Sequence, residues 1–507
     1  MTNLLFDTLF HGQPDDSTCL ILEDDSTISY GELLHESARV ANALVELGIQ
    51  PGDRVAAQID KSVAAVALYL GIVRAGAAFL PLNTAYTARE VEYFINDAEP
   101  ALFICKPGSE LELGPMSTTA NAQLKTLDSD GKAGSWIDLV NEAADEFTTV
   151  ARDADDLATI LYTSGTTGRS KGAMITHQNL AANSITLVKY WGFSADDVLL
   201  HALPIFHIHG LFVAINTAMI AGASMVFLPG FNNQTVLEYL PKCTVMMGVP
   251  TFYTRLLALD KFNRAATKHM RLFISGSAPM TLETHKAFQQ RTGQTILERY
   301  GMTETNMNTS NPYDGERVAG SVGFPLPGVE LRITDPKSTD VKELPTATIG
   351  MIEVRGPNVF KGYWQMPEKT AEEFRGDGFF ITGDLGMIDD QGYVHIVGRN
   401  KDLVISGGYN VYPKEIEILI DNLDGVYESA VIGLPHKDLG EVVIAVVVKS
   451  ANSTIDEATI KTALKDQLAR YKQPREIFFI DVLPRNAMSK VQKNELRQTY
   501  QDLYVRQ

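Results

Sequence analysis

Residues Leu161–Ala173 read LYTSGTTGRSKGA and directly follow a strand-like apolar run that begins at Ala158. Glycines in this stretch let the backbone approach a ligand closely, and its hydroxyl groups and Lys171 supply donors and a mobile positive charge. Such a loop suits a polyphosphate. It is not a Walker A loop, because Ser170 and Gly172 flank Lys171 where that motif requires Gly-Lys-Ser/Thr. We therefore predict a phosphate-binding loop, and the competing interpretation is a flexible surface turn.

Outward from this loop, helical and strand-like segments alternate along the chain. Apolar residues recur at helical spacing from Ser29 and again from Ser62, and strand-like runs begin at Asp53 and Ala77. This alternation favours parallel α/β layering. The sequence therefore predicts a large, multi-layer α/β body.

The chain changes character near Arg399–Asp402, where residues rich in glycine and charge are followed by short alternating strands and a helix from Ala458. We predict a large N-terminal domain over 1–398, a hinge at 399–402 and a small α+β C-terminal domain over 403–507.

Composition excludes several classes of protein. The chain has 507 residues, with 44 Lys+Arg against 62 Asp+Glu and a formal charge of -18, which argues against a generic nucleic-acid or anionic-membrane binder. No window is apolar enough to span a membrane. The three cysteines are far apart and form no CxxC pair, which fits a reducing compartment. We expect a cytoplasmic monomer or homodimer with small-molecule partners, no nucleic acid and no membrane span.

Further segments accompany the loop in a fixed order along essentially the whole chain. They are ISYGEL at Ile28, VRAGAAFLPLNTAY at Val73, LPIFHIHG at Leu203, ISGSAP at Ile274, ERYGMTET at Glu298, ITGDLG at Ile381, GRNKDLVISGGYNVYP at Gly398 and LPRNAMSKVQK at Leu483. Together they resemble the adenylate-forming superfamily, which contains acyl-CoA synthetases, luciferases and peptide-synthetase adenylation domains. Within it, ALPIFHIHGLFVA, MGVPTFYTRLL and LERYGMTETNMNTSNPYDG are most similar to malonate–CoA ligases.

The resemblance implies an acyl-CoA synthetase-like fold with a mobile C-terminal lid, and a two-step reaction that uses MgATP and coenzyme A. A carboxylate attacks the α-phosphate of MgATP to give acyl-AMP and pyrophosphate. The thiol of coenzyme A then attacks the acyl-AMP carbonyl and releases AMP. Both steps depend mainly on positioning and charge neutralisation.

The resemblance also implies the ATP site. Glu304 would hold Mg²⁺, which often takes only one or two ligands from a protein, and Thr303 would contact the α-phosphate. Residues 276–279 would line the adenine, and Asp384 would accept hydrogen bonds from the ribose. The expected ATP-binding residues are Thr163, Ser164, Gly165, Thr166, Thr167, Gly168, Lys171, Gly276, Ser277, Ala278, Pro279, Glu298, Tyr300, Gly301, Asp384 and Arg399.

Lys490 is the main catalytic candidate that the resemblance implies, together with Glu304, Thr303 and His207. A lysine on a mobile domain can neutralise charge at the reacting phosphate in one domain arrangement only. Ser489 stands where the family has glycine, and Lys493 is the alternative as a solvated helix charge. His207 would flank the acyl carboxylate, although a histidine here can also be a packed core residue.

The second step places further residues of the C-terminal domain at the site. Gly407 and Gly408 would leave room for the pantetheine arm of coenzyme A, with Tyr409 and Lys472 as further contacts. Lys401 matches the hinge position of the family, where a backbone torsion change swings the domain.

Arginines near the expected acyl pocket indicate which acid is used. Arg299 stands where most acyl-CoA synthetases have a small residue, and Arg255 follows GVPTFYT in a segment that borders the pocket in the family; Met302 completes this set. A buried, unpaired charge costs about 3–5 kcal/mol, so these arginines favour a second, distal carboxylate on the substrate. Malonate is the smallest such acid, and methylmalonate is a second candidate. The alternative is that Arg299 forms a salt bridge with Glu298 or another acid and faces away.

Other functions remain open at this point. A ligase for another short carboxylic acid, a luciferase-like oxidase, a carrier-loading adenylation enzyme and a non-catalytic ATP-binding module all share parts of the pattern. The last is disfavoured because Lys490, Glu304 and Asp384 are all present.

Overall fold

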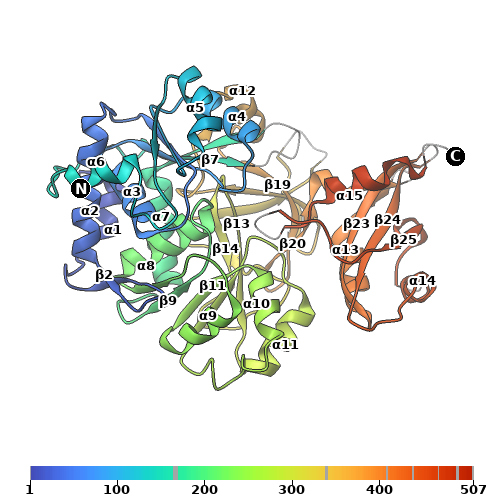
Figure 1. Cartoon of the computed structure of the whole chain (residues 1–507). Helices are drawn as coiled ribbons and strands as arrows, with labels where there is room; N and C mark the ends of the chain where they lie inside the picture. Colours follow the sequence, from blue (N-terminus) through green and yellow to red (C-terminus); the bar gives the residue numbers. More distant parts are fainter. Residues whose placement is uncertain are drawn as a thin grey trace.

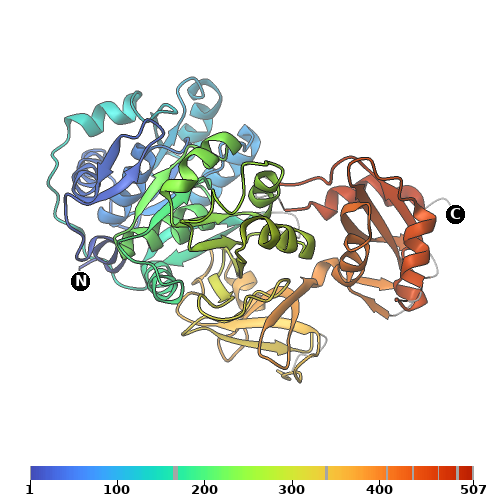
Figure 2. The same ribbon diagram turned by 90° about the horizontal axis from the view of Figure 1, so that it is seen from below.

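The computed structural model describes residues 2–163, 170–336, 341–406, 409–436, 439–465, 467–486 and 490–504. Within these ranges the strands form four sheets. Figures 1 and 2 show a large body and, beside it, a smaller unit built from the C-terminal part of the chain. The predicted class, α/β with a large N-terminal body and a small C-terminal domain, is confirmed.

A nine-stranded sheet holds the short apolar runs VMMG and LFIS side by side, with Val245 opposite Leu272. Its strands from β13 through β12, β11, β9 and β10 to β1 are parallel neighbours. Their carboxyl ends therefore meet at one edge, where ligands bind in open α/β sheets. The order is β15 (Phe324–Pro325), β14 (Asn306–Ser310), β13 (Ile296–Met302), β12 (Leu272–Ser275), β11 (Val245–Gly248), β9 (Val198–His201), β10 (Ser224–Phe227), β1 (Thr18–Ile21) and β2 (Thr27–Ser29).

A seven-stranded sheet carries the residues on either side of the predicted phosphate loop. Thr163 ends one strand and pairs with Lys171, the first residue of its antiparallel neighbour. The order is β18 (Gly362–Tyr363), β8 (Lys171–Thr176), β7 (Leu157–Thr163), β4 (Ala78–Pro81), β3 (Arg54–Ala57), β5 (Leu102–Cys105) and β6 (Gln123–Thr126).

The two predicted N-terminal helices pack against each other at close range. Ser29 caps the first and forms a capping box with Glu32, and Ser62 caps the second. A Cβ at Gly71 would lie 2.2 Å from Val40 Cγ1, so glycine is needed where these helices cross. The body helices are α1 (Leu4–Phe10), α2 (Tyr30–Glu46), α3 (Val63–Arg74), α4 (Ala88–Ala98), α5 (Glu110–Thr119), α6 (Ser135–Glu142), α7 (His177–Tyr190), α8 (Asn216–Ala221), α9 (Asn233–Tyr239), α10 (Pro250–Leu257), α11 (Leu282–Thr292) and α12 (Pro367–Glu373), with a π-helix over His209–Ile215 and a 3₁₀ turn over Leu240–Lys242.

The C-terminal unit, called the lid below, has its own apolar cores. Among the described residues, the body cores include side chains up to Ile396, and the lid cores begin at Val404. The 3₁₀ turn Asn400–Asp402 lies between them and contains Lys401, the predicted hinge residue. The domain limits 1–398 and 403–507 stay predictions.

The lid is a five-stranded sheet with three helices, seen in orange and red in Figure 1. Its elements are β22 (Tyr409–Val411), β21 (Val404–Ser406), β24 (Gly440–Lys449), β23 (Val426–His436), β25 (Glu476–Phe479), α13 (Pro413–Asp421), α14 (Glu457–Lys465) and α15 (Lys493–Tyr500), with 3₁₀ turns over Arg470–Lys472 and Gln501–Leu503. The helix predicted from Ala458 is shorter than expected, because the chain turns after it and Leu468 packs into the lid core.

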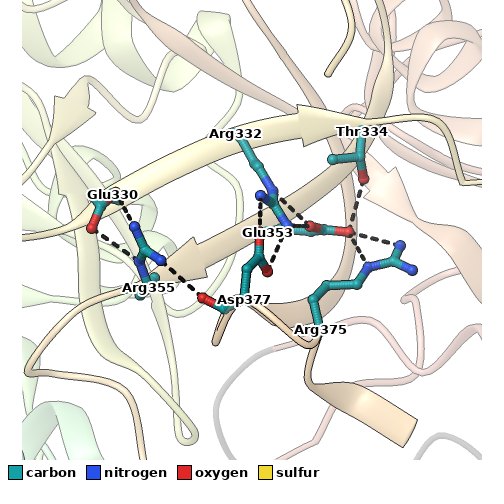
Figure 3. A network of polar contacts seen from close by, with 7 residues as sticks. All are labelled: Glu330, Arg332, Thr334, Glu353, Arg355, Arg375 and Asp377. Atoms are coloured by element: carbon teal, nitrogen blue, oxygen red, sulfur yellow. Dashed lines mark hydrogen bonds and ion pairs between the residues drawn. The ribbon is translucent and has the colours of Figure 1, made fainter. Parts of the chain in front are cut away.

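A four-stranded antiparallel sheet lies in the body next to the lid and contains a polar network (Figure 3). Glu353 is fully buried and receives hydrogen bonds from Arg332, Arg375 and Thr334 at 2.8–2.9 Å. Arg332 also contacts Asp377 at 2.6 Å. The strands are β16 (Glu330–Thr334), β17 (Gly350–Arg355), β19 (Phe380–Ile388) and β20 (Val394–Arg399).

In the part of the chain that the structure describes, no helix is long and apolar enough to cross a membrane.

Candidate active site

The predicted phosphate-binding lysine is held by a carboxylate. Lys171 Nζ lies 2.9 Å from Glu373 Oε1, at the end of α12, and 3.9 Å from the centre of the Tyr363 ring. Thr163 Oγ1 donates to the Lys171 carbonyl at 3.5 Å. The other predicted phosphate ligands, Ser164, Gly165, Thr166, Thr167 and Gly168, lie outside the described residues.

The predicted magnesium ligand Glu304 is buried in the turn between β13 and β14, directly after Thr303. Its Oε1 accepts a hydrogen bond from Tyr363 Oη at 3.1 Å. Burial raises the pKa of Glu304, and the charges of Arg399 and Lys171 act in the opposite direction. No group of three or more possible metal-binding side chains occurs in the described ranges. As a buried carboxylate whose Oε2 accepts no hydrogen bond from another described residue, Glu304 offers the hard oxygen ligand that the magnesium of MgATP takes from a protein.

The predicted ribose-binding carboxylate is fixed from two sides. Asp384 Oδ2 accepts a hydrogen bond from Tyr300 Oη at 2.5 Å, and Arg399 Nε lies 2.7 Å from its Oδ1. Each oxygen keeps a further lone pair for a ribose hydroxyl. Gly301 lies beside this group, and a Cβ there would be 1.9 Å from the Asn306 carbonyl oxygen, so only glycine fits.

The predicted adenine loop, residues 276–279, follows β12 at the carboxyl edge of the nine-stranded sheet. Ser277 has a φ of 70°, which is unusual for a residue other than glycine. The carboxylate of Glu298 is bound to His285 at 2.6 Å and faces α11. Its Oε2 also accepts a hydrogen bond from the backbone amide of Met280, directly after the loop, at 3.4 Å. The Glu298 side chain is therefore engaged in contacts within the protein that support the end of this loop.

Arg299 is buried and is not paired with Glu298. It is 4% exposed, and its Nε and Nη2 have no hydrogen-bond partner among the described residues. Burial lowers the pKa of Arg299 to about 9, so it is still charged at neutral pH. A Cβ at Gly276 would lie 2.4 Å from the Arg299 Cζ, which places the guanidinium directly against the adenine loop.

Two histidines face this guanidinium. Burial and then the charge of Arg299 lower the pKa of His207 to about 4 and hold that of His209 well below its usual range, so both rings are neutral at pH 7. His209 Nδ1 is hydrogen-bonded to Ser277 Oγ at 3.2 Å, and its Nε2 is buried without a partner in the described structure. The arrangement leaves two buried donors of Arg299 and one buried ring nitrogen of His209 available to a ligand.

Arg255 does not join Arg299. Phe252, Tyr253 and Leu256 form the buried face of α10, whereas Arg255 is exposed and lines an open surface hollow of about 610 Å³. The expected arginine pair at the acyl pocket is therefore not formed. Met302 lies with its Sδ 4.0 Å from Tyr300 Oη, on the side of the Asp384 group.

The lid brings Lys490 to the body. Repulsion from Arg399, and then burial, lower the pKa of Lys490 to about 8, and the charge of Lys490 also reaches His207. Lys401, the predicted hinge, acts on the same group.

The predicted coenzyme A contacts lie elsewhere on the lid. Tyr409 is stacked on Tyr471 with ring centroids 4.6 Å apart, and Lys472 Nζ is paired with Glu415 at 2.7 Å. Gly407 and Gly408 lie outside the described residues.

Three residues of this site were not predicted from the sequence. Tyr363 and Glu373 lie outside the quoted segments, and Glu373 follows Lys171 by 202 positions, so no spacing rule joins them. His209 was within a quoted segment, and its position two residues after His207 was the only indication.

Residues 6–364 match the family model of AMP-binding enzymes, and residues 415–490 match that of the AMP-binding enzyme C-terminal domain. The chain belongs to the AMP-binding enzyme family. The superfamily inferred from the sequence is thereby confirmed, as is its character as an enzyme.

Solved structures extend this family match. The chain is 58% identical to MatB from Rhodopseudomonas palustris; the ATP-bound crystal structure gives a TM-score of 0.97, covering 99% of this chain and 100% of that one. The apo structure of MatB gives 0.86 at the same identity and coverage. This AMP-binding enzyme therefore superimposes more closely on the ATP-bound structure of MatB than on the apo structure.

Curated relatives differ in the acid that their names state. The malonate–CoA ligase of Arabidopsis thaliana is 33% identical, over 95% of this chain and 86% of the relative. A feruloyl-CoA synthase of an Amycolatopsis species is also 33% identical, over 94% of both chains. Overall identity alone therefore does not choose the acid.

Proposed function

We propose that the enzyme joins malonate to coenzyme A at the expense of ATP, through malonyl-AMP, releasing pyrophosphate and then AMP. The observation that carries the choice of acid is the buried Arg299, which has two unpaired nitrogen donors among the described residues. Methylmalonate is included as a second substrate, because one methyl group changes binding by only about 1–3 kcal/mol.

A distal carboxylate completes the environment of Arg299. A guanidinium offers a planar fork that matches a carboxylate, and the charge of Arg299 acts on the buried His209, whose Nε2 has no partner among the described residues. A monocarboxylic acid such as acetate would leave these groups unsatisfied. In malonate, the distal carboxylate would lie at Arg299 while the other carboxylate is activated. The longer chain of succinate would move its distal carboxylate away from that position.

In the first step, an oxygen of the other carboxylate attacks the α-phosphorus of ATP and pyrophosphate leaves. Lys171 and the loop before it would hold the β- and γ-phosphates, Thr303 the α-phosphate, and Asp384 the ribose. Magnesium supplies charge neutralisation when bound, and Glu304 would hold it. Lys490 would stabilise the charge that develops at the reacting carboxylate and phosphate.

In the second step, the coenzyme A thiol attacks the malonyl-AMP carbonyl and AMP leaves. The lid would turn about Lys401, which removes Lys490 from the site. Gly407, Gly408, Tyr409 and Lys472 would then face coenzyme A. His207, neutral at pH 7, would flank the carbonyl in both steps without competing for the anion.

The test is thioester formation dependent on ATP and coenzyme A, measured with acetate, malonate, methylmalonate and succinate. We expect malonate to have the highest kcat/KM. Arg299→Met should lower kcat/KM for malonate by about 10³-fold and leave that for acetate within about threefold. Arg255→Met is the matched control, because this exposed arginine should change neither value. Another acid leading the panel, or Arg299→Met with unchanged malonate activity, would refute the proposed substrate.

We also expect the enzyme to work in the cytoplasm as a monomer or homodimer. Cys19, Cys105 and Cys243 are buried and free, which is consistent with a reducing compartment.

A further inference from the structure

The lysine that the proposed function assigns to the triphosphate already has an anion beside it. Lys171 Nζ is 2.9 Å from Glu373 Oε1, and the two side chains are only 15% and 20% exposed. Partial burial weakens the screening by water, so this pair is stronger than a fully exposed one. Hydrogen bonds from Tyr363 and Lys171 outweigh burial and lower the pKa of Glu373, so the carboxylate is ionised at neutral pH.

A tyrosine connects this pair to the predicted magnesium ligand. Tyr363 Oη lies 2.6 Å from Glu373 Oε2 and 3.1 Å from Glu304 Oε1. A phenol carries one hydrogen, so it can donate fully to only one of these carboxylates, and the shorter distance favours Glu373. Glu304 is thereby left with an acceptor free for a cation while Glu373 holds the lysine.

The position of Glu373 in α12 does not explain why a glutamate stands there. Glu373 is the last residue of α12, where the helix dipole disfavours a negative charge. Its helix partner Lys369 lies 3.2 Å away, yet Lys369 contacts the neighbouring Glu372 at a shorter 3.0 Å. The contacts that hold Glu373 in place are therefore those to Lys171 and Tyr363, which belong to the other side of the site.

We propose that Glu373 is an internal competitor for ATP: its carboxylate occupies Lys171 in the free enzyme, is displaced by the triphosphate, and returns as pyrophosphate leaves. This inference rests on the proposed function for the role of Lys171. A lysine ammonium bound to a carboxylate is available to a phosphate only for the fraction of time that the pair is open. The apparent affinity for ATP is lowered by that fraction.

The competition affects both the binding of ATP before the first half-reaction and the release of pyrophosphate after it. Before it, Glu373 weakens ATP binding and keeps the lysine charged and placed next to the loop. After it, the same carboxylate competes with pyrophosphate for Lys171 and speeds its release. Glu373 is thus a positioning residue: it acts on the binding of ATP and the release of pyrophosphate through Lys171.

The test is calorimetric titration of the intact enzyme with MgATP in the absence of acid and coenzyme A, where no reaction can occur. Glu373→Gln keeps an acceptor for Tyr363 but removes the charge, and should tighten ATP binding by about three- to tenfold. Glu372→Gln is the matched control: it removes the same charge from the adjacent residue, which contacts Lys369 and not Lys171. It should leave the ATP affinity within about twofold. Thermal melting of each variant checks that it is folded.

A second pair of variants tests whether Glu373 acts through Lys171. In a Lys171→Ala background, Glu373→Gln should change ATP binding by less than about twofold. In steady-state assays of the single variant, KM for ATP should fall more than kcat changes, and inhibition by pyrophosphate should become stronger.

The outcomes separate this inference from the proposed function. Equal ATP affinity of Glu373→Gln and Glu372→Gln overturns the competitor role, as does a gain that persists without Lys171. ATP binding that is unaffected by Lys171→Ala overturns the assignment of that lysine to the triphosphate instead, and with it part of the proposed function.

Discussion

Two buried arginines of this enzyme have opposite surroundings. Arg332, in the four-stranded sheet, has a 9% exposed side chain and contacts two carboxylates, Glu353 and Asp377 (Figure 3). Arg299, at the carboxyl edge of the nine-stranded sheet, is 4% exposed and has no carboxylate partner in the described structure. Arg332 therefore stabilises the fold, whereas the buried charge of Arg299 destabilises the free enzyme until an anionic ligand pairs with it.

The difference teaches how a buried charge can be interpreted. Burial of an arginine alone says little, because a paired arginine and an unpaired one can be equally buried. Their pKa values separate them: carboxylates raise the pKa of Arg332 against the effect of its burial, whereas burial lowers that of Arg299. An unpaired, buried arginine beside an adenine loop therefore indicates a binding site for an anion.

The largest effect should come from making the same substitution in both places. Arg332→Met leaves Glu353 buried with Arg375 as its remaining ion-pair partner, and should lower the free energy of unfolding by about 3 kcal/mol. Arg299→Met removes an unpaired charge and should raise it by about 1–2 kcal/mol. Urea denaturation without ligands measures both. The comparison fails if the two variants lose similar stability.

Lys490 is a further cation to compare, because the positive charge of Arg399 destabilises its charged form. Repulsion from Arg399 lowers its pKa to about 8, so Lys490 is charged below that pH and neutral above it. Adenylate formation should therefore fall as pH rises, by about tenfold for each unit above 8, when kcat/KM for ATP is followed by pyrophosphate release. Lys490→Arg should abolish this decline, because arginine stays charged. A wild-type profile that is flat to pH 10 would contradict the role of Lys490.

The smallest effect on stability should appear at the exposed edge of the polar network around Glu353. Glu330 pairs with Arg355 at 2.7 Å, but both side chains are largely exposed, so water screens the pair. Glu330→Gln should lower the free energy of unfolding by less than about 1 kcal/mol, measured in the same urea experiment. A loss as large as that of Arg332→Met would show that burial does not set the strength of these pairs.

Local features of the fold were predictable from the sequence because they depend on residues close together in the chain. The capping box of Ser29 and Glu32 marks the start of α2, and the short apolar runs at Val245 and Leu272 became adjacent parallel strands. The ordered motifs then placed the chain in its superfamily.

Contacts between distant segments were not predictable in this way. Nothing in the sequence indicates that Glu373 reaches Lys171, or that Tyr363 bridges to Glu304. Arg255 is a different case, because the spacing of Phe252, Tyr253 and Leu256 already defines the buried face of α10, and Arg255 falls outside it. A helical projection of this segment would have placed Arg255 outside the buried face of α10.

The contact between Gly276 and Arg299 constrains the order in which this enzyme could change its acid in evolution. A side chain at Gly276 would collide with the guanidinium, so the adenine loop has to stay bare while the arginine is present. Replacing Arg299 first removes that obstacle, and Gly276 can then accept a methyl group. A lineage leaving dicarboxylic acids would thus pass through position 299 before position 276, and the reverse route would meet a damaged intermediate.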